Sequence, residues 1–270
     1  MTLAPEALAH ELLAALDGTR QIEPLTARRP DFDLSQAYAV AAAVRALRIA
    51  RGEKPVGRKI GFTNRDLWAQ YKIDQPIWGD MYAHTVSAVD ASPRFALSHL
   101  CEPQIEPEIV FGLAHPPQPQ MDERALLECI GWVAHGFEIV QSIFPGWRFT
   151  SADTVAAFGM HGALRIGRPL EVTPHNRGAL FDALTTFTVD LARDGTIVET
   201  GRGANVLGGP LSALLHLVQL LERDPHNPPL SAGEIVTTGT LTRACPVRAG
   251  EVWSTRLSGI PLGGLSLRFG

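Results

Sequence analysis

Two acidic residues inside an apolar, strand-like run constrain the fold of this chain most. The run QIEPEIVFGL, residues 104–113, holds Glu106 and Glu108 among residues typical of a buried strand. Acidic residues are poor strand formers and are rarely buried unless a partner neutralises them. Because side chains alternate along a strand, both carboxylates project from one face, roughly 6–7 Å apart at the backbone. The fold around this strand must therefore supply a counter-charge or leave this face in water.

Pro107 stands between the two acids and donates no backbone hydrogen bond. A proline inside a strand indicates an edge position or an opening in the hydrogen-bond ladder. We expect this opening to lie at the mouth of a site.

A third acid, Glu138, lies in the run HGFEIVQ between Phe137 and Ile139. Carboxylates that share a desolvated site repel one another. A hard divalent cation relieves this repulsion, because three carboxylates fill half an octahedron and leave positions for water or substrate. The alternative is a solvated strand face, which a single strand glutamate would favour. The pattern by itself keeps both a metal site and a solvated face open.

Helical and strand-like segments are unevenly distributed along the chain. Leucines at helical spacing predict a helix over residues 5–17, and a second helix is predicted over residues 34–51. The whole chain holds 25 glycines and 20 prolines, and most of them follow these helices among short β-like runs, which indicates a twisted sheet structure. We therefore expect an α+β fold, with a helical cap or arm over residues 1–55 and a mixed β-roll or sandwich over residues 56–270.

The β-like part contains further predicted elements. Short helices are expected at TNRDLWAQYK and DERALLECIGWV, and a longer one over residues 210–222. Asp194-Gly195 predicts a hairpin turn inside LTTFTVDLARDGTIVETG. The remaining predicted strands are VGRKIGFT, QIEPEIVFGL, HGFEIVQSIF, HGALRIG, GEIVTTGTL and EVWSTRLSGIPLGGLSLRFG.

Charge and cysteine usage exclude several classes of protein. The formal net charge is -4 and no cluster of lysines or arginines occurs, so nucleic acid is not expected as a partner. The N-terminal segment is amphipathic and acidic, unlike a signal peptide, and no membrane span is expected. Cys101, Cys129 and Cys245 are widely spaced and predict no disulfide framework, which suits a reducing cytoplasm.

Three further residues are candidates for chemistry. Lys59, in GRKIGFT, could pair with a substrate carboxylate or transfer a proton, or could be a surface lysine. Asp80, in PIWGDMYAH, could contact the substrate or a residue that holds it, or could be a turn residue. His161, which follows the glycine-punctuated run AFGM, is a candidate acid/base or shape determinant, although single histidines are more often core or surface residues.

Several separated blocks resemble one known family in order and spacing. The blocks are KIGFT near 59, DQPIWGDM near 74, IEPEIVF near 105, FEIVQSIFPGW and DTVA between 137 and 156, TGRGANVLGGPL near 200 and GEIVTTGTL near 233. With these blocks the chain resembles the 2-keto-4-pentenoate hydratase and 4-oxalocrotonate decarboxylase group of the fumarylacetoacetate hydrolase superfamily. The resemblance covers nearly all of the chain after about residue 35.

The resemblance implies a β-roll with an N-terminal helical part, and a bound Mg²⁺ or Mn²⁺. It assigns the metal to Glu106, Glu108 and Glu138, places Lys59 against the substrate and places Asp80 near the pocket. It also implies a homo-oligomer and a small 2-oxo acid as the substrate, as in the breakdown of aromatic compounds.

The implied chemistry has three possible outcomes. A 2-oxo or 2-hydroxy-dienoic acid, such as 2-hydroxypenta-2,4-dienoate, would chelate the cation, which stabilises charge on the C2 oxygen. Water could then add at C4 to give a 4-hydroxy-2-oxo acid, which is the expected hydratase reaction. The alternatives are decarboxylation of a 2-oxo-enedioate and C–C bond hydrolysis of an acylpyruvate.

One segment departs from the family pattern. After Asp-Thr-Val-Ala the family usually reads Asp-Asn-Ala-Ser-Ser/Cys-Gly, whereas residues 157–162 of this chain read Ala-Phe-Gly-Met-His-Gly. The departure is the best support for a non-catalytic alternative, an inactive partner subunit or a small-acid-binding homologue. Retention of three glutamates and Lys59 favours an enzyme, and Gly201–Gly203 (GRG) favours the hydratase.

Overall fold

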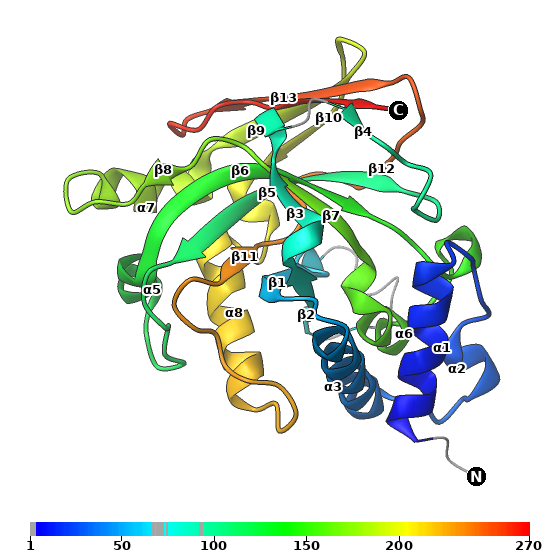
Figure 1. Ribbon diagram of the computed structural model, residues 1–270. Helices are drawn as coiled ribbons and strands as arrows, with labels where there is room; N and C mark the ends of the chain where they lie inside the picture. Colours follow the sequence, from blue (N-terminus) through cyan, green and yellow to red (C-terminus); the bar gives the residue numbers. More distant parts are fainter. Residues whose placement is uncertain (1–3, 66–67, 69–72, 74, 92–93) are drawn as a thin grey trace.

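The N-terminal fifty residues form both predicted helices and also a short third helix, Leu25–Arg28, that was not predicted. In the computed structural model, which describes all residues except 1–3, 66–67, 69–72, 74 and 92–93, α1 and α3 pack side by side at one end of the molecule (Figure 1). Asp33 caps α3 by accepting a hydrogen bond from the backbone of Gln36. The helices of this part are α1 (Pro5–Asp17), α2 (Leu25–Arg28) and α3 (Leu34–Ala50).

A large curled sheet forms the centre of the molecule and carries the acidic strand (Figure 1). Within the described residues its strand order is β2-β1-β11-β5-β6-β7-β3, with β12 also paired to β5 and β8 to β6. Strand β1 runs parallel to β11, and β5 runs antiparallel to both β11 and β6. The strands are β1 (Pro55–Gly61), β2 (Ile77–Tyr82), β3 (Val86–Ala88), β5 (Gln104–Leu113), β6 (Ile130–Val140), β7 (His161–Ile166), β8 (Leu170–Glu171), β11 (Ile235–Thr237) and β12 (Cys245–Pro246).

A smaller sheet lies across the top of the view in Figure 1. Its order is β10-β9-β13-β14-β4 among the residues that the structure covers. The predicted hairpin turn between β9 and β10 is confirmed, since Asp194 and Gly195 both adopt positive φ, at 49° and 82°. The strands are β4 (Arg94–Phe95), β9 (Thr188–Arg193), β10 (Thr196–Arg202), β13 (Val252–Ser258) and β14 (Ser266–Phe269).

The remaining helices differ partly from the prediction. Helix α8 is confirmed, but α5 is shorter than predicted because the chain enters β6 at Ile130 and pairs with β5. Helices α6 and α7 were not predicted, and the predicted helix at TNRDLWAQYK lies mostly outside the described residues. The helices are α5 (Glu123–Cys129), α6 (Ser151–Ala156), α7 (Arg177–Thr186) and α8 (Pro210–Glu222), with single 3₁₀ turns η2 (Ala83–Thr85), η3 (Val89–Ala91), η4 (Pro145–Trp147), η5 (Phe158–Met160) and η6 (Gly203–Asn205).

Helix α8 packs in the core. By length and composition alone, the stretch Gly203–Glu222 could cross a membrane, but 56% of its apolar window is buried inside the molecule. Leu211, Leu214 and Leu217 pack in the largest apolar cluster together with residues of β5 and β6. A buried core helix passes the same length test, so this stretch is weak support for a membrane span.

A second apolar cluster joins the N-terminal helices to the far end of the large sheet. Val40 of α3 lies in it with Val140 of β6 and Met160 of η5. The mixed α/β architecture with a curled sheet agrees with the predicted fold class. The division at residue 55 and the β-roll description stay predictions, since this cluster spans the expected boundary.

Candidate metal centre

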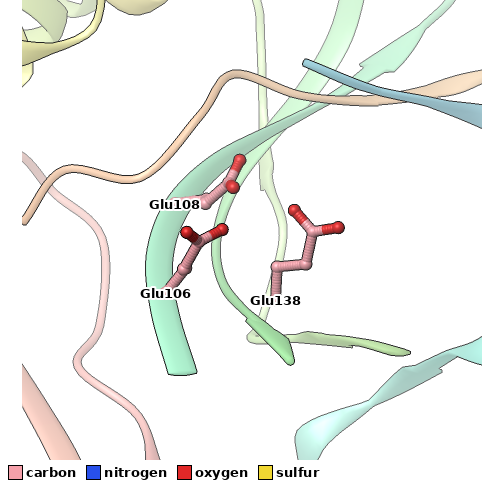
Figure 2. Close-up of side chains that lie close together, drawn as sticks. All are labelled: Glu106, Glu108 and Glu138. Carbon is pink, nitrogen blue, oxygen red and sulfur yellow. The ribbon is translucent and has the colours of Figure 1, made fainter. Parts of the chain in front are cut away.

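The pairing of β5 with β6 brings the three predicted glutamates together. Glu106 lies directly opposite Glu138 in the ladder, and Glu108 lies opposite Gly136. One carboxylate oxygen from each of the three glutamates lies within 4.8 Å of the others. Figure 2 shows the three side chains converging from these two strands. Like charges directly opposite one another destabilise a strand pair, so this arrangement needs a compensating charge.

The hydrogen bonds of the two fully buried glutamates leave one oxygen of each without a partner. Glu108 Oε2 accepts a hydrogen bond of 2.7 Å from the backbone N–H of Gly239, and Glu138 Oε1 accepts one of 2.8 Å from His161 Nδ1. Glu108 Oε1 and Glu138 Oε2 are buried and accept no hydrogen bond among the described residues, although Glu138 Oε2 forms an ion pair with Lys59. Buried carboxylate oxygens without hydrogen bonds are ligands that a hard divalent cation takes, so the residues present fit a metal.

Lys59 supplies the positive charge nearest to the three acids. Its Nζ lies 3.3 Å from Glu138 Oε2, and the side chain is buried. Burial alone would lower the pKa of Lys59, but the three carboxylates raise it above its usual value. The lysine stem passes close to Gly159, where an added Cβ would lie 2.9 Å from Lys59 Cδ and φ is +60°. Glycine at this position therefore makes room for the lysine.

The acids titrate unequally because their partners differ. Burial raises the pKa of Glu106 to about 7, and burial together with the Glu138 charge raises the pKa of Glu108 well above its usual value. Burial acts in the same direction on Glu138, but the Lys59 charge and the His161 hydrogen bond outweigh it and lower the Glu138 pKa to about 2. With all groups ionised, three carboxylates and one ammonium leave two uncompensated negative charges, which equals the charge of one divalent cation.

A cavity of about 290 Å³ opens beside Lys59 and the partly exposed Glu106. Its walls differ in polarity. One wall is apolar and belongs to the second core cluster: Phe62, Ile77, Val140, Trp147, Phe149 and Met160. The loop between β11 and β12 forms another wall with Thr240, Thr242, Arg243 and Ala244.

The structure brings together five of the six predicted site residues. Asp80 is the exception: it does not line the cavity and instead pairs with Arg58 and Arg45, at 3.2 and 3.3 Å. This position follows from strand alternation, because Asp80 lies opposite Arg58 in the β1–β2 ladder and Lys59 projects from the other face of β1.

His161 contacts Glu138 but does not line the cavity. Its Nδ1 lies against Glu138 and its Nε2 lies 2.8 Å from Thr85 Oγ1. The position therefore suits a residue that holds Glu138 better than one that touches substrate. An acid/base role for His161 stays a prediction.

Three features of the site were not predicted from the sequence. The Gly239 N–H that binds Glu108 has φ +94° and lies in the block GEIVTTGTL, which was noted only as a family match. Thr85, whose hydroxyl contacts His161, lies in no sequence pattern that predicted a site. The aromatic wall of Trp147 and Phe149 lies at and just after the block FEIVQSIFPGW, where the PGW sequence indicates a turn and not a pocket wall.

The chain is similar in sequence to several characterised hydratases. It is 32% identical over 256 residues to the 2-keto-4-pentenoate hydratase of Paraburkholderia xenovorans (strain LB400), covering 94% of this chain and 91% of that protein. It is 29% identical over 265 residues to the 2-hydroxyhexa-2,4-dienoate hydratase of Comamonas testosteroni, covering 98% and 97%. A scan against protein-family models finds no match.

Solved structures agree with this similarity. The 4-oxalocrotonate decarboxylase from Pseudomonas putida G7, complexed with magnesium and adipate, superposes with a TM-score of 0.89 at 28% identity, covering 100% of this chain and 99% of that chain. Fumarylpyruvate hydrolase from Pseudomonas aeruginosa, in complex with Mn²⁺ and pyruvate, shares the fold with a TM-score of 0.54 at 15% identity, covering 80% and 89%. The chain therefore belongs to the 2-keto-4-pentenoate hydratase family.

Proposed function

We propose that this protein is a hydro-lyase that uses Mg²⁺ or Mn²⁺ to add water to a 2-hydroxy-dienoic acid such as 2-hydroxypenta-2,4-dienoate, giving a 4-hydroxy-2-oxo acid. The observation that carries this proposal is the cluster of three carboxylates, with two buried oxygens that accept no hydrogen bond, beside a cavity that Lys59 also lines. The cavity, at about 290 Å³, is near the lower end of the size range of small-molecule sites. The names of the hydratase relatives support the reaction.

The glutamates and Lys59 would have different roles in such a site. Glu106, Glu108 and Glu138 would hold the cation, which when bound would stabilise negative charge that develops on the substrate's C2 oxygen. Lys59 keeps its proton at neutral pH, because its pKa is raised by the neighbouring carboxylates. It therefore suits binding of the substrate carboxylate or donation of a proton, and does not suit a general base.

The polarity of the cavity favours hydration over decarboxylation. A 2-oxo-enedioate carries a second carboxylate at its far end, and burying that charge against an apolar wall without a partner is costly. Among the described lining residues the cations are Lys59 and Arg243, and Arg243 already pairs with Glu199. The decarboxylase neighbour, by contrast, was solved with adipate, a dicarboxylate. A substrate whose far end is uncharged therefore matches the apolar wall better.

Product analysis separates the candidate reactions. The purified protein with Mg²⁺ is given 2-hydroxypenta-2,4-dienoate, a 2-oxo-enedioate and an acylpyruvate, and the products are followed by mass spectrometry. We expect the dienoate to gain the mass of one water without cleavage. Release of CO₂ from the enedioate as the fastest reaction would indicate a decarboxylase, and a cleaved pair of acids would indicate a C–C hydrolase.

The non-enzymatic alternative is tested with Glu106→Gln. An inactive partner subunit or small-acid-binding homologue has no need of this carboxylate for turnover. We expect the substitution to remove both turnover and Mn²⁺ binding. If both are unchanged, the metal-enzyme proposal is wrong.

The same proposal includes a homo-oligomer in the cytoplasm with no nucleic-acid or membrane partner. It rests on the family resemblance and on the composition of the chain. The proposed β-roll of residues 56–270 behind a helical part, residues 1–55, is supported by the position of α1 and α3 at one end of the curled sheet.

A further inference from the structure

Glu108 and Glu138, on the two paired strands, each accept a hydrogen bond at one oxygen. Gly239 N–H donates to Glu108 Oε2, and His161 Nδ1 donates to Glu138 Oε1. The other oxygen of Glu108 has no hydrogen-bond partner among the described residues, and the other oxygen of Glu138, Oε2, lies 3.3 Å from Lys59 Nζ. The hydrogen bond to Glu108 comes from the backbone, whereas the hydrogen bond to Glu138 Oε1 depends on one side chain, His161.

His161 is itself held in place. Its side chain is 3% exposed, and its Nε2 lies 2.8 Å from Thr85 Oγ1. The Thr85 hydroxyl also lies 2.9 Å from the carbonyl oxygen of Tyr82, which ties η2 to the end of β2. With a contact at both ring nitrogens, the imidazole has little freedom to turn away from Glu138.

Restraining one oxygen limits how a carboxylate can bind a cation. A carboxylate oxygen that already accepts a hydrogen bond is a weaker ligand, so such a side chain favours binding a cation through its other oxygen, whereas Ca²⁺ commonly takes six to eight oxygens and can use both oxygens of a carboxylate. Mg²⁺ requires a compact octahedron, which single-oxygen ligands suit. The number of oxygens that Glu138 offers is therefore a determinant of metal choice.

We infer that His161 is a positioning residue that restricts Glu138 to one-oxygen ligation and so makes the centre favour Mg²⁺ or Mn²⁺ over Ca²⁺. The inference rests on the metal site of the proposed function. It gives a role to the segment Ala157–Gly162, where this chain departs from the family pattern and has a histidine in place of a small side chain.

The test measures dissociation constants of Mg²⁺, Mn²⁺ and Ca²⁺ by calorimetry for the wild type, His161→Ala and His161→Asn. Removing an outer partner of a metal ligand typically changes affinity by 10–100-fold. We expect His161→Ala to shift the preference toward Ca²⁺ by about 10-fold, and His161→Asn, whose amide can still donate to Glu138, to stay near the wild-type ratio.

The outcomes separate this inference from the proposed function. An unchanged Ca²⁺/Mg²⁺ ratio in folded His161→Ala, with metal binding intact, overturns the role of His161 and leaves the metal enzyme standing. Failure of the wild type to bind any of the three ions overturns both. If His161→Ala does not fold, Thr85→Val, which loosens the imidazole from its other side, is expected to shift the ratio in the same direction by a smaller factor, and no shift overturns the inference. A crystal structure of the Ca²⁺-loaded variant should show Glu138 binding through both oxygens.

Discussion

Two clusters of charged side chains lie on opposite faces of β1, and they differ in net charge. Arg58 and Lys59 are consecutive residues, so strand alternation sends their side chains to different sides of the sheet. Arg58 pairs with Glu234 at 2.7 Å and with Asp80 at 3.2 Å, and Arg45 adds a second cation beside Asp80. The cluster around Arg58 therefore holds two positive and two negative groups.

The cluster around Lys59 holds one positive group and three negative ones. The unpaired atoms differ too. In the Arg58 cluster they are Arg58 Nε and Nη2, which are donors near the Trp78 ring and cannot bind a cation. In the Lys59 cluster they are carboxylate oxygens. Buried charge by itself does not indicate a site; uncompensated charge with unpaired acceptors, beside a cavity, does.

Glu108→Gln should give the largest effect, because it removes one ligand and one charge from the unbalanced cluster. We expect a loss of about 10³-fold in kcat/KM and the loss of tight Mn²⁺ binding. Turnover of the dienoate and calorimetry with Mn²⁺ measure the two quantities.

The matched control is Glu234→Gln, which makes the same chemical change in the balanced cluster. Its kcat/KM should stay within about threefold of wild type once corrected for the folded fraction. A large loss of kcat/KM in the control would show that the two clusters do not differ in function.

Arg58→Met should act on stability instead and lower the free energy of unfolding. It leaves the partly buried Asp80 and Glu234 carboxylates without the fully buried Arg58 as their central partner, and breaking a buried ion pair costs about 3 kcal/mol or more. Urea unfolding followed by circular dichroism measures the free energy of unfolding. A loss of less than about 1 kcal/mol in the free energy of unfolding would mean that water solvates the two carboxylates in the variant.

The stability of the metal-free protein should fall as the pH rises from about 4.5 to 7. The pKa values of Glu106 and Glu108 are raised mainly by burial, so the folded state binds these protons more tightly than the unfolded state does. The stabilisation is present below the usual carboxyl pKa and is lost as the pH approaches the raised value. We expect Glu106 alone to give a loss of about 2 kcal/mol, after allowing for its partial exposure, and Glu108 to add to this loss.

The contribution of Glu138 to stability changes with pH in the opposite direction, and it does so over a lower pH range. Its pKa is lowered to about 2, so its contribution is present above the usual value and is lost only as the pH falls from about 4.5 toward 2. Thermal unfolding over this pH range, with EDTA and with Mg²⁺, tests the prediction. Saturating Mg²⁺ should remove the loss above pH 5, and a loss that persists with Mg²⁺ would argue against the proposed ligands.

Arg45→Met should have the smallest effect. Its side chain is 21% exposed and lies 3.3 Å from Asp80, which also keeps Arg58 as a partner. A partly solvated pair of this kind contributes on the order of 1 kcal/mol or less. Urea unfolding and kcat/KM should both stay close to wild type, and a strong loss of activity would instead support a catalytic role for Asp80.

The elements that carry the site could be predicted because they are local patterns. The spacing of Glu106 and Glu108 with period-two alternation predicted their common strand face, and β5 is confirmed. The leucine stripes predicted α1 and α8 for the same reason. The end of α5 could not be predicted in this way, because β6 gains its ladder only from pairing with β5.

The sequence by itself determined which charged groups lie in apolar strands: three carboxylates and Lys59. The carboxylates need a counter-charge wherever these strands meet. Only the tertiary structure decided which of these groups meet and in what state. Strand register placed Glu138 opposite Glu106, alternation on β1 sent Arg58 away from the cavity, and pairing with β2 placed Asp80 beside Arg58. Contacts over long sequence separations tied His161 to both Glu138 and Thr85. Such contacts depend on how distant segments pack, and no local spacing encodes them.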